Sequence, residues 1–105
     1  QASFNAYIRD YPDGQYTANA YYWLGELYLT KNDLPRARSA FDKLVKRYPD
    51  YRKTPESSYK LATIYDQMGD EQKSRAMLQK IVREYGEKSP NTVTQASAYL
   101  DKHFR

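Results

Sequence analysis

Residues 21–28, with the sequence Tyr-Tyr-Trp-Leu-Gly-Glu-Leu-Tyr, decide the fold of this chain. The Leu-Gly-x-x-Tyr core of the stretch recurs 37 residues downstream, at 61–65, as Leu-Ala-x-x-Tyr. A small residue at the second position, Gly25 or Ala62, lets a neighbouring helix approach closely, which compensates for the low helix propensity of glycine. Each copy therefore predicts a helix that packs tightly against another helix.

The same offset of 37 residues relates a second kind of segment. Four columns stay apolar or aromatic in three copies: Phe4, Phe41 and Leu78; Tyr7, Leu44 and Ile81; Ile8, Val45 and Val82; and Tyr11, Tyr48 and Tyr85. Their relative spacing of i, i+3, i+4 and i+7 is that of an amphipathic helix with one buried face. Each copy of the repeat therefore contains a second helix.

Capping residues divide the predicted helices from one another. Side chains suited to accept a hydrogen bond from a first helical turn stand at Thr17, Asp33, Thr54, Asp70 and Asn91. Asn32 and Gly69 suit the left-handed conformation that ends many helices, and Pro55 suits a first turn. The predicted layout has six helices, near 1–11, 18–31, 34–48, 55–68, 71–85 and 92–104.

The first full copy of the repeat carries a family pattern. The stretch at 21–28, followed by Ala37, Phe41 and Pro49, resembles the tetratricopeptide repeat, in which an aromatic residue, Leu-Gly-x-x-Tyr, Ala, Phe and Pro stand at this spacing. The resemblance implies an all-α fold: a tetratricopeptide-type α-solenoid of about six antiparallel helices, with two full repeats flanked by half-repeats.

The second copy departs from that pattern. It has Ser58, Ser74 and Gly86 where an aromatic residue, Ala and Pro are usual. Three residues beyond the usual repeat length of 34 fall at 51–53. We interpret this segment as a loop insertion, which a repeat tolerates easily.

Length and composition bound the class of protein. The chain has 105 residues, of which 40% are hydrophobic and 29% charged, and these values fit a single folded domain over 1–105. Because the chain begins inside a predicted helix, we expect the domain to be excised from a longer protein. The net charge of +4 permits an acidic partner without requiring one.

No pattern in the sequence predicts catalysis or a cofactor. There is no cysteine, and the one histidine, His103, lies near the end of the chain, so a catalytic triad or a histidine metal site is not expected. Tyr99, Asp101 and His103 are interpreted as the surface of the terminal helix. No apolar run approaches the length of about 20 residues that spans a bilayer. We therefore predict a non-enzymatic protein without a metal site or cofactor that does not insert into a membrane.

Three stretches carry a closer resemblance. Residues 4–13, 18–26 and 45–50, which include two Tyr-Pro-Asp endings and Tyr-Tyr-Trp-Leu-Gly-Glu, are similar to the C-terminal domain of the YbgF/CpoB family. That resemblance implies a periplasmic protein of the Tol-Pal system that binds TolA, helps to coordinate cell division with outer-membrane constriction, and trimerises through a coiled coil. The alternative family is the lipoprotein of the outer-membrane barrel-assembly machinery, which shares the Tyr-Pro-Asp ending.

A partner-binding groove is predicted on the concave side of the stacked repeats, which the first helix of each pair lines. The residues expected there are Asn19, Tyr22, Trp23, Glu26, Glu56, Tyr59, Thr63 and Asp66. Tyr21, Tyr28 and Tyr65 are expected in the core instead. For Tyr22, Trp23 and Tyr59, partner contact and helix packing remain equal alternatives. Aromatic residues with an acidic rim would suit a partner segment that brings apolar anchors flanked by Lys or Arg.

Three other functions are weighed against this groove. A clamp for an acidic chaperone tail needs Lys, Arg and Asn in the groove, where this chain offers mainly aromatic and acidic residues. The acidic pair Glu26 and Asp66 is a very weak indication of glycan hydrolysis. Nucleic-acid binding would use the basic residues at 36–53, but Asp42 and Asp50 interrupt them, and a solvated helix face explains them better.

Overall fold

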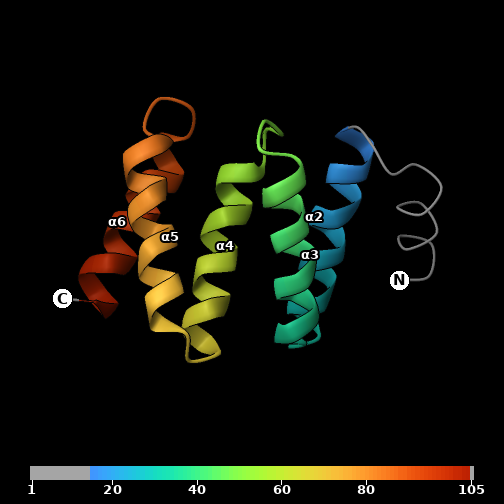
Figure 1. Ribbon diagram of the computed structural model, residues 1–105, viewed down its shortest axis with the longest axis horizontal. Helices are drawn as coiled ribbons and strands as arrows, with labels where there is room; N and C mark the ends of the chain where they lie inside the picture. Colours follow the sequence, from blue (N-terminus) through green and yellow to red (C-terminus); the bar gives the residue numbers. More distant parts are fainter. Residues whose placement is uncertain (1–14, 105) are drawn as a thin grey trace. The chain divides into compact units, whose positions relative to one another are not determined.

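All regular secondary structure in the described part of the chain is α-helical. The computed structural model describes residues 15–104. Its helices are α2 (Gln15–Thr30), α3 (Leu34–Arg47), α4 (Thr54–Gln67), α5 (Glu71–Glu84) and α6 (Pro90–His103), as Figure 1 shows. The predicted all-α class is therefore confirmed, and each of these helices corresponds to a predicted one. The helix predicted near 1–11, with its four apolar columns, lies outside the described residues.

The turns inside each helical hairpin form as the sequence predicts. Asn32 has a φ of 58° and Gly69 a φ of 91°, the left-handed conformation that ends a helix. Asp33 and Asp70 then cap the next helix, because each side chain accepts a hydrogen bond from the backbone amide three residues further on, at 3.3 and 3.2 Å. In both copies, a residue in the left-handed conformation thus ends one helix, and the Asp that follows it caps the next helix.

Two of the other three predicted caps are wrong, whereas Thr54 is the first residue of α4. Helix α2 begins before Thr17, which is fully buried inside it, and helix α6 begins before Asn91, with Ser89 at its N-cap. The Thr54 hydroxyl donates to the backbone carbonyl of Tyr48 at 2.6 Å. The offset of 37 residues fails here because the connections between hairpins differ in length, so that α6 starts early relative to α4.

The chain divides into two compact units, residues 1–54 and 55–105. In the first unit, α2 and α3 form a helical hairpin in which α3 comes close to α2 at Gly25. A Cβ atom on that residue would lie 2.6–2.8 Å from three ring atoms of Phe41, which is too close for any real side chain. The close approach that the sequence predicts at this position is therefore present.

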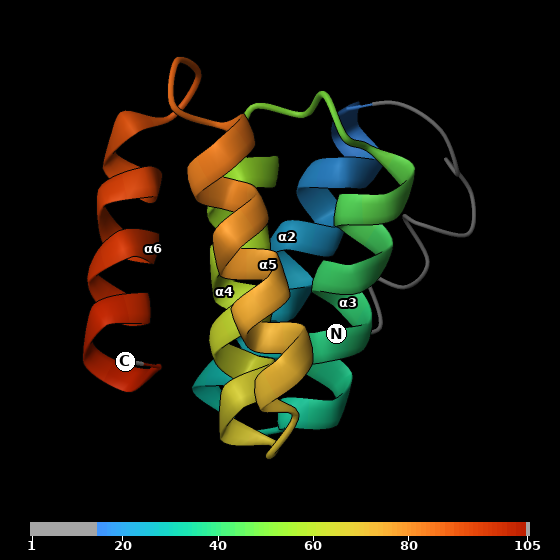
Figure 2. The ribbon, with the colours of Figure 1, turned by 60° about the vertical axis from the view of Figure 1, so that its left-hand side comes forward.

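The second unit contains α4, α5 and α6; in Figure 2, α5 passes in front of α4 and α6 stands to their left. Its core consists of Ala62 from α4, Leu78 and Ile81 from α5, and Ala96 from α6. Seven partly buried residues pack against this core: Tyr59, Met77, Tyr85, Val93, Tyr99, Leu100 and Phe104. Apolar residues of all three helices thus meet at one centre.

The predicted core residues differ in burial: several are fully buried, whereas Val45, Tyr48, Tyr65 and Tyr85 are half-buried and Val82 is exposed. Tyr21 and Tyr28 are 5% and 9% exposed, in agreement with the prediction, but Tyr65 is only half-buried. Val82 is 37% exposed, although its column was expected to be buried. This column lies at the edge of the apolar stripe, where a helix face begins to turn towards solvent.

Candidate functional site

The eight residues predicted to line a groove divide equally between the two units. Asn19, Tyr22, Trp23 and Glu26 lie on α2 in the first unit, and Glu56, Tyr59, Thr63 and Asp66 lie on α4 in the second. Within each unit, the side chains are engaged in quite different contacts. Whether they touch a partner stays a prediction.

The predicted residues of α2 include an aromatic corner, formed by Tyr22 and Trp23. Their ring centroids are 5.2 Å apart and their planes meet at 83°. Tyr22 is only 4% exposed, and its ring also meets Phe41 edge to face at 6.1 Å, whereas Trp23 is 45% exposed. Tyr22 therefore forms the buried side of the corner, and Trp23 forms its solvent-exposed side.

A lysine from the connection between α3 and α4 covers this corner. The ammonium nitrogen of Lys53 lies 4.4 Å from the ring centroid of Tyr22 and 5.1 Å from that of Trp23. Both distances are within the range of about 6 Å in which a cation is attracted by the face of an aromatic ring. The first unit thus already holds a positive charge against the exposed ring of Trp23.

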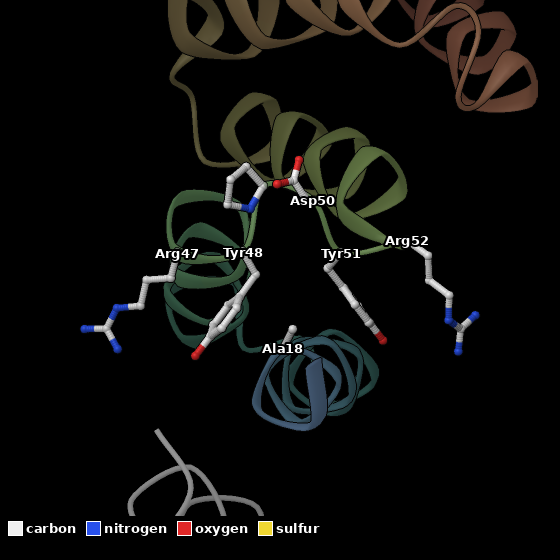
Figure 3. A pocket seen from close by; sticks show the side chains of 7 residues that line it. Ala18, Arg47, Tyr48, Asp50, Tyr51 and Arg52 are labelled. Atoms are coloured by element: carbon white, nitrogen blue, oxygen red, sulfur yellow. The ribbon is translucent and has the colours of Figure 1, made fainter. Parts of the chain in front are cut away.

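The same connection also fixes Asn19. The hydroxyl of Tyr51 donates to the side-chain oxygen of Asn19 at 2.6 Å. Tyr51 also forms one wall of an open hollow of about 460 Å³, which Figure 3 shows with Tyr48 and Tyr51 on either side of Ala18. The hollow is lined by Ala18, Arg47, Tyr48, Pro49, Asp50, Tyr51 and Arg52. Asn19 therefore acts in part as a structural tie between α2 and the connection.

Glu26 places a carboxylate one helical turn beyond the corner. It is half-buried on α2, four residues after Tyr22, and residues at this spacing are neighbours on a helix face. Its backbone carbonyl accepts a hydrogen bond from the hydroxyl of Thr30 at 3.0 Å. The α2 surface thus combines aromatic rings with a nearby acidic group.

In the second unit, the predicted groove residues Tyr59 and Asp66 contact a residue of the last helix. The hydroxyl of Tyr99 donates to a carboxylate oxygen of Asp66 at 2.5 Å, and the rings of Tyr59 and Tyr99 meet edge to face at 6.2 Å. Burial raises the pKa of Tyr99, and the hydrogen bond to Asp66 raises it further. Burial also raises the pKa of Tyr59. The three side chains therefore form one linked cluster, which we call the Tyr99 cluster.

The remaining predicted residues of α4 make local contacts. A carboxylate oxygen of Glu56 lies 3.9 Å from the ammonium nitrogen of Lys60, one turn along the helix, and pairs at this spacing add only about 0.2 to 0.5 kcal/mol. The hydroxyl of Thr63 donates to the backbone carbonyl of Lys60 at 2.8 Å. Neither residue adds an exposed aromatic side chain like Trp23 of the first unit.

Sequence reasoning missed three residues of these clusters. Tyr51 and Lys53 fall in the segment that we interpreted as a tolerated insertion, yet they contact Asn19 and the aromatic corner. Tyr99 was assigned to the helix surface, and that prediction is wrong because its ring is half-buried and its hydroxyl is bonded. The one indication in the sequence was that the insertion consists of an aromatic residue and two basic residues.

Other binding chemistry is weakly represented. Basic side chains of α3 pair locally, with Arg36 lying 3.6 Å from Asp33 and Lys46 lying 3.2 Å from Asp42. Among the residues that the structure describes, no cluster of three or more His, Cys, Asp or Glu side chains is suited to a metal ion. In the same part of the chain, no helix combines the length and apolar character required to cross a membrane.

Comparison with known proteins agrees with the geometry of the helices. A family model described as the tetratricopeptide repeat matches residues 16–87. Two curated relatives from Pseudomonas putida, each described as cell division coordinator CpoB, are 59% identical to this chain over 32 residues. Each match covers 30% of this chain and 12% of the relative, so the chain corresponds to only a small part of those proteins.

Proposed function

The chain belongs to the tetratricopeptide repeat family, and from this premise we propose that it is a non-enzymatic protein-interaction module of the bacterial cell envelope that acts in cell division. Repeats of this type bind other proteins through extended surfaces made by stacked helix pairs. The role in division is supported by the 59% identity, over 32 residues, to the relatives described as cell division coordinators.

The observation that carries the proposal is the aromatic corner on α2, in which Trp23 is exposed. Trp23 is 45% exposed beside the buried ring of Tyr22, and Trp and Tyr are the residues that most often dominate the energy of protein interfaces. The carboxylate of Glu26 lies one turn further along the same helix. A surface of this composition suits a partner segment that carries an apolar anchor next to a positive charge.

The proposed partner is a basic, helical envelope protein, and TolA of the Tol-Pal system is the specific candidate. TolA and a periplasmic location come from the resemblance to the YbgF/CpoB family described above. The aromatic and acidic character of the α2 surface is compatible with such a partner because opposite charges across an interface steer association and select among partners.

The proposal is tested by titrating purified TolA into the 105-residue chain and measuring the dissociation constant by calorimetry. We expect Trp23→Ala to weaken binding at least tenfold, because truncation of a central aromatic residue commonly costs about 2 kcal/mol or more. Val82→Ala is the matched control, since Val82 is exposed to a similar degree but lies on α5, outside the predicted groove. Equal losses in both variants, or no binding by the parent chain, would contradict the proposal.

A further inference from the structure

The aromatic corner of the first unit is occupied by a side chain of the same unit. Lys53 places its ammonium nitrogen 4.4 Å from the ring centroid of Tyr22 and 5.1 Å from that of Trp23. Because the two ring planes meet at 83°, the cation lies in an angle between two aromatic side chains instead of on a single ring. Such two-sided aromatic surroundings are a known means of recognising ammonium groups.

The position of Lys53 is set by the turn that precedes α4. The backbone amide of Thr54 donates to the carbonyl of Tyr51 at 2.9 Å, which closes a turn around Lys53. Tyr51 is itself tied to Asn19 on α2 by its hydroxyl, at 2.6 Å. The segment 51–53 therefore holds a lysine over the corner through contacts that do not involve the lysine itself.

We propose that the corner formed by Tyr22 and Trp23 is a binding site for a Lys or Arg side chain of the partner, and that Lys53 is a built-in competitor for that site. The corner offers two ring faces to a cation, and the half-buried carboxylate of Glu26 adds negative charge one helical turn away. When no partner is bound, the ammonium group of Lys53 occupies the corner. This inference rests on the proposed function only for the statement that the ligand belongs to a protein partner.

The competition reduces the apparent affinity of the corner for an external cation. The external cation binds only to the fraction of molecules in which the corner is free, so the apparent dissociation constant rises as that fraction falls. A cation–π contact at a partly exposed site implies that removing the internal lysine strengthens external binding roughly three- to sixfold. The segment 51–53 would thereby restrict binding to partners that displace Lys53 from the corner.

The test uses the fluorescence of Trp23, which is the single tryptophan of the chain. Tetramethylammonium chloride is titrated into the 105-residue parent and into Lys53→Met, and tryptophan emission is recorded, with sodium chloride at equal ionic strength as the blank. Arg52→Met is the matched control, because it removes one positive charge from the adjacent residue, whose guanidinium lies over the ring of Tyr51 and not over the corner. Circular dichroism checks that each variant folds.

The expected result is a three- to sixfold lower dissociation constant for tetramethylammonium in Lys53→Met, with Arg52→Met unchanged from the parent. The proposal is overturned if Lys53→Met and the parent respond equally, if Arg52→Met gains as much as Lys53→Met, or if sodium chloride produces the same change as tetramethylammonium. A cation response without TolA binding would remove the proposed function and leave this site in place. TolA binding without a cation response would remove this site and leave the proposed function in place.

Discussion

The two units carry the same repeat but fill its equivalent positions differently. In the first unit, Gly25 faces Phe41 at a separation that leaves no room for a Cβ atom. In the second, 37 residues along, Ala62 and Leu78 are both fully buried in one core. A larger side chain on one helix is thus matched by a smaller one on its partner helix. At this position the two copies thus keep a similar combined side-chain volume although both residues differ.

The positions predicted to meet a partner also differ between the units. The first unit leaves Trp23 exposed, with Lys53 against its ring. In the second unit, Tyr59 and Asp66 are held by Tyr99 from the following helix. We therefore expect a polar or aromatic residue at a predicted groove position to be available to a partner only where the following helix does not already contact it.

The largest effect is expected from Phe41→Ala. Its side chain is fully buried between α2 and α3, and truncation of a buried Phe typically lowers the free energy of unfolding by about 3 to 5 kcal/mol. Urea denaturation followed by circular dichroism measures the loss. Arg38→Ala, at an exposed position of the same helix, should change the free energy by no more than about 0.5 kcal/mol. A similar loss in both variants would mean that the repeat alignment, which places Phe41 in a buried column, is wrong.

The volume exchange between units predicts a coupling between Gly25 and Phe41. Gly25→Ala alone should lower the free energy of unfolding by about 1 to 2 kcal/mol, because overpacking outweighs the gain in helix propensity. In a Phe41→Leu background, which copies the residues of the second unit, the same change should be neutral or stabilising. A double-mutant cycle from urea denaturation gives the coupling energy. Additive effects would mean that the clash relaxes without cost.

A smaller effect is expected from Ser74→Ala. The Ser74 hydroxyl is buried and has no hydrogen-bond partner among the described residues, whereas the equivalent residue of the first unit is Ala37. Removing the hydroxyl should raise the free energy of unfolding by about 1 kcal/mol, which corresponds to about 4 to 8 °C in the melting temperature of a domain of this size. Ala37→Ser should produce a loss of similar size. A lower melting temperature for Ser74→Ala would imply a partner for the hydroxyl in solution.

The smallest effect concerns the Tyr99 cluster at alkaline pH. The pKa of Tyr99 is raised in the folded state by burial and by its bond to Asp66, so the neutral phenol favours folding. That contribution is complete below the ordinary pKa of about 10 and is lost as the pH rises through the folded value. The stability difference between the parent and Tyr99→Phe should therefore shrink between about pH 8 and about pH 11. A constant difference in urea denaturation would contradict the raised pKa.

The sequence predicted the described helices to within a few residues, and it predicted the turns at 32–33 and 69–70 in detail. These features depend on local rules, namely the period of apolar residues and the chemistry of caps. The start of α6 was misplaced because the connection before it differs in length from the connection before α4, and no periodic pattern constrains these lengths.

The predicted site was only partly accessible to the same reasoning. Helical spacing placed Tyr22 and Trp23 on one surface of α2, but it could not predict that one would be 4% exposed and the other 45%. Nor could it predict that Lys53 and Tyr99 would contact the predicted residues, since these contacts join segments 30 or more positions apart. Contacts over such separations leave no periodic trace in one sequence.

By itself, the sequence determined the helical class, the repeat and the turns inside each hairpin, because apolar periodicity and capping chemistry act over a few neighbouring positions. Only the tertiary structure decided which aromatic side chains remain open, because exposure depends on what other segments bring against a helix face. The turn at 51–54 places a cation over Trp23 in the first unit, and α6 places a phenol against Asp66 in the second.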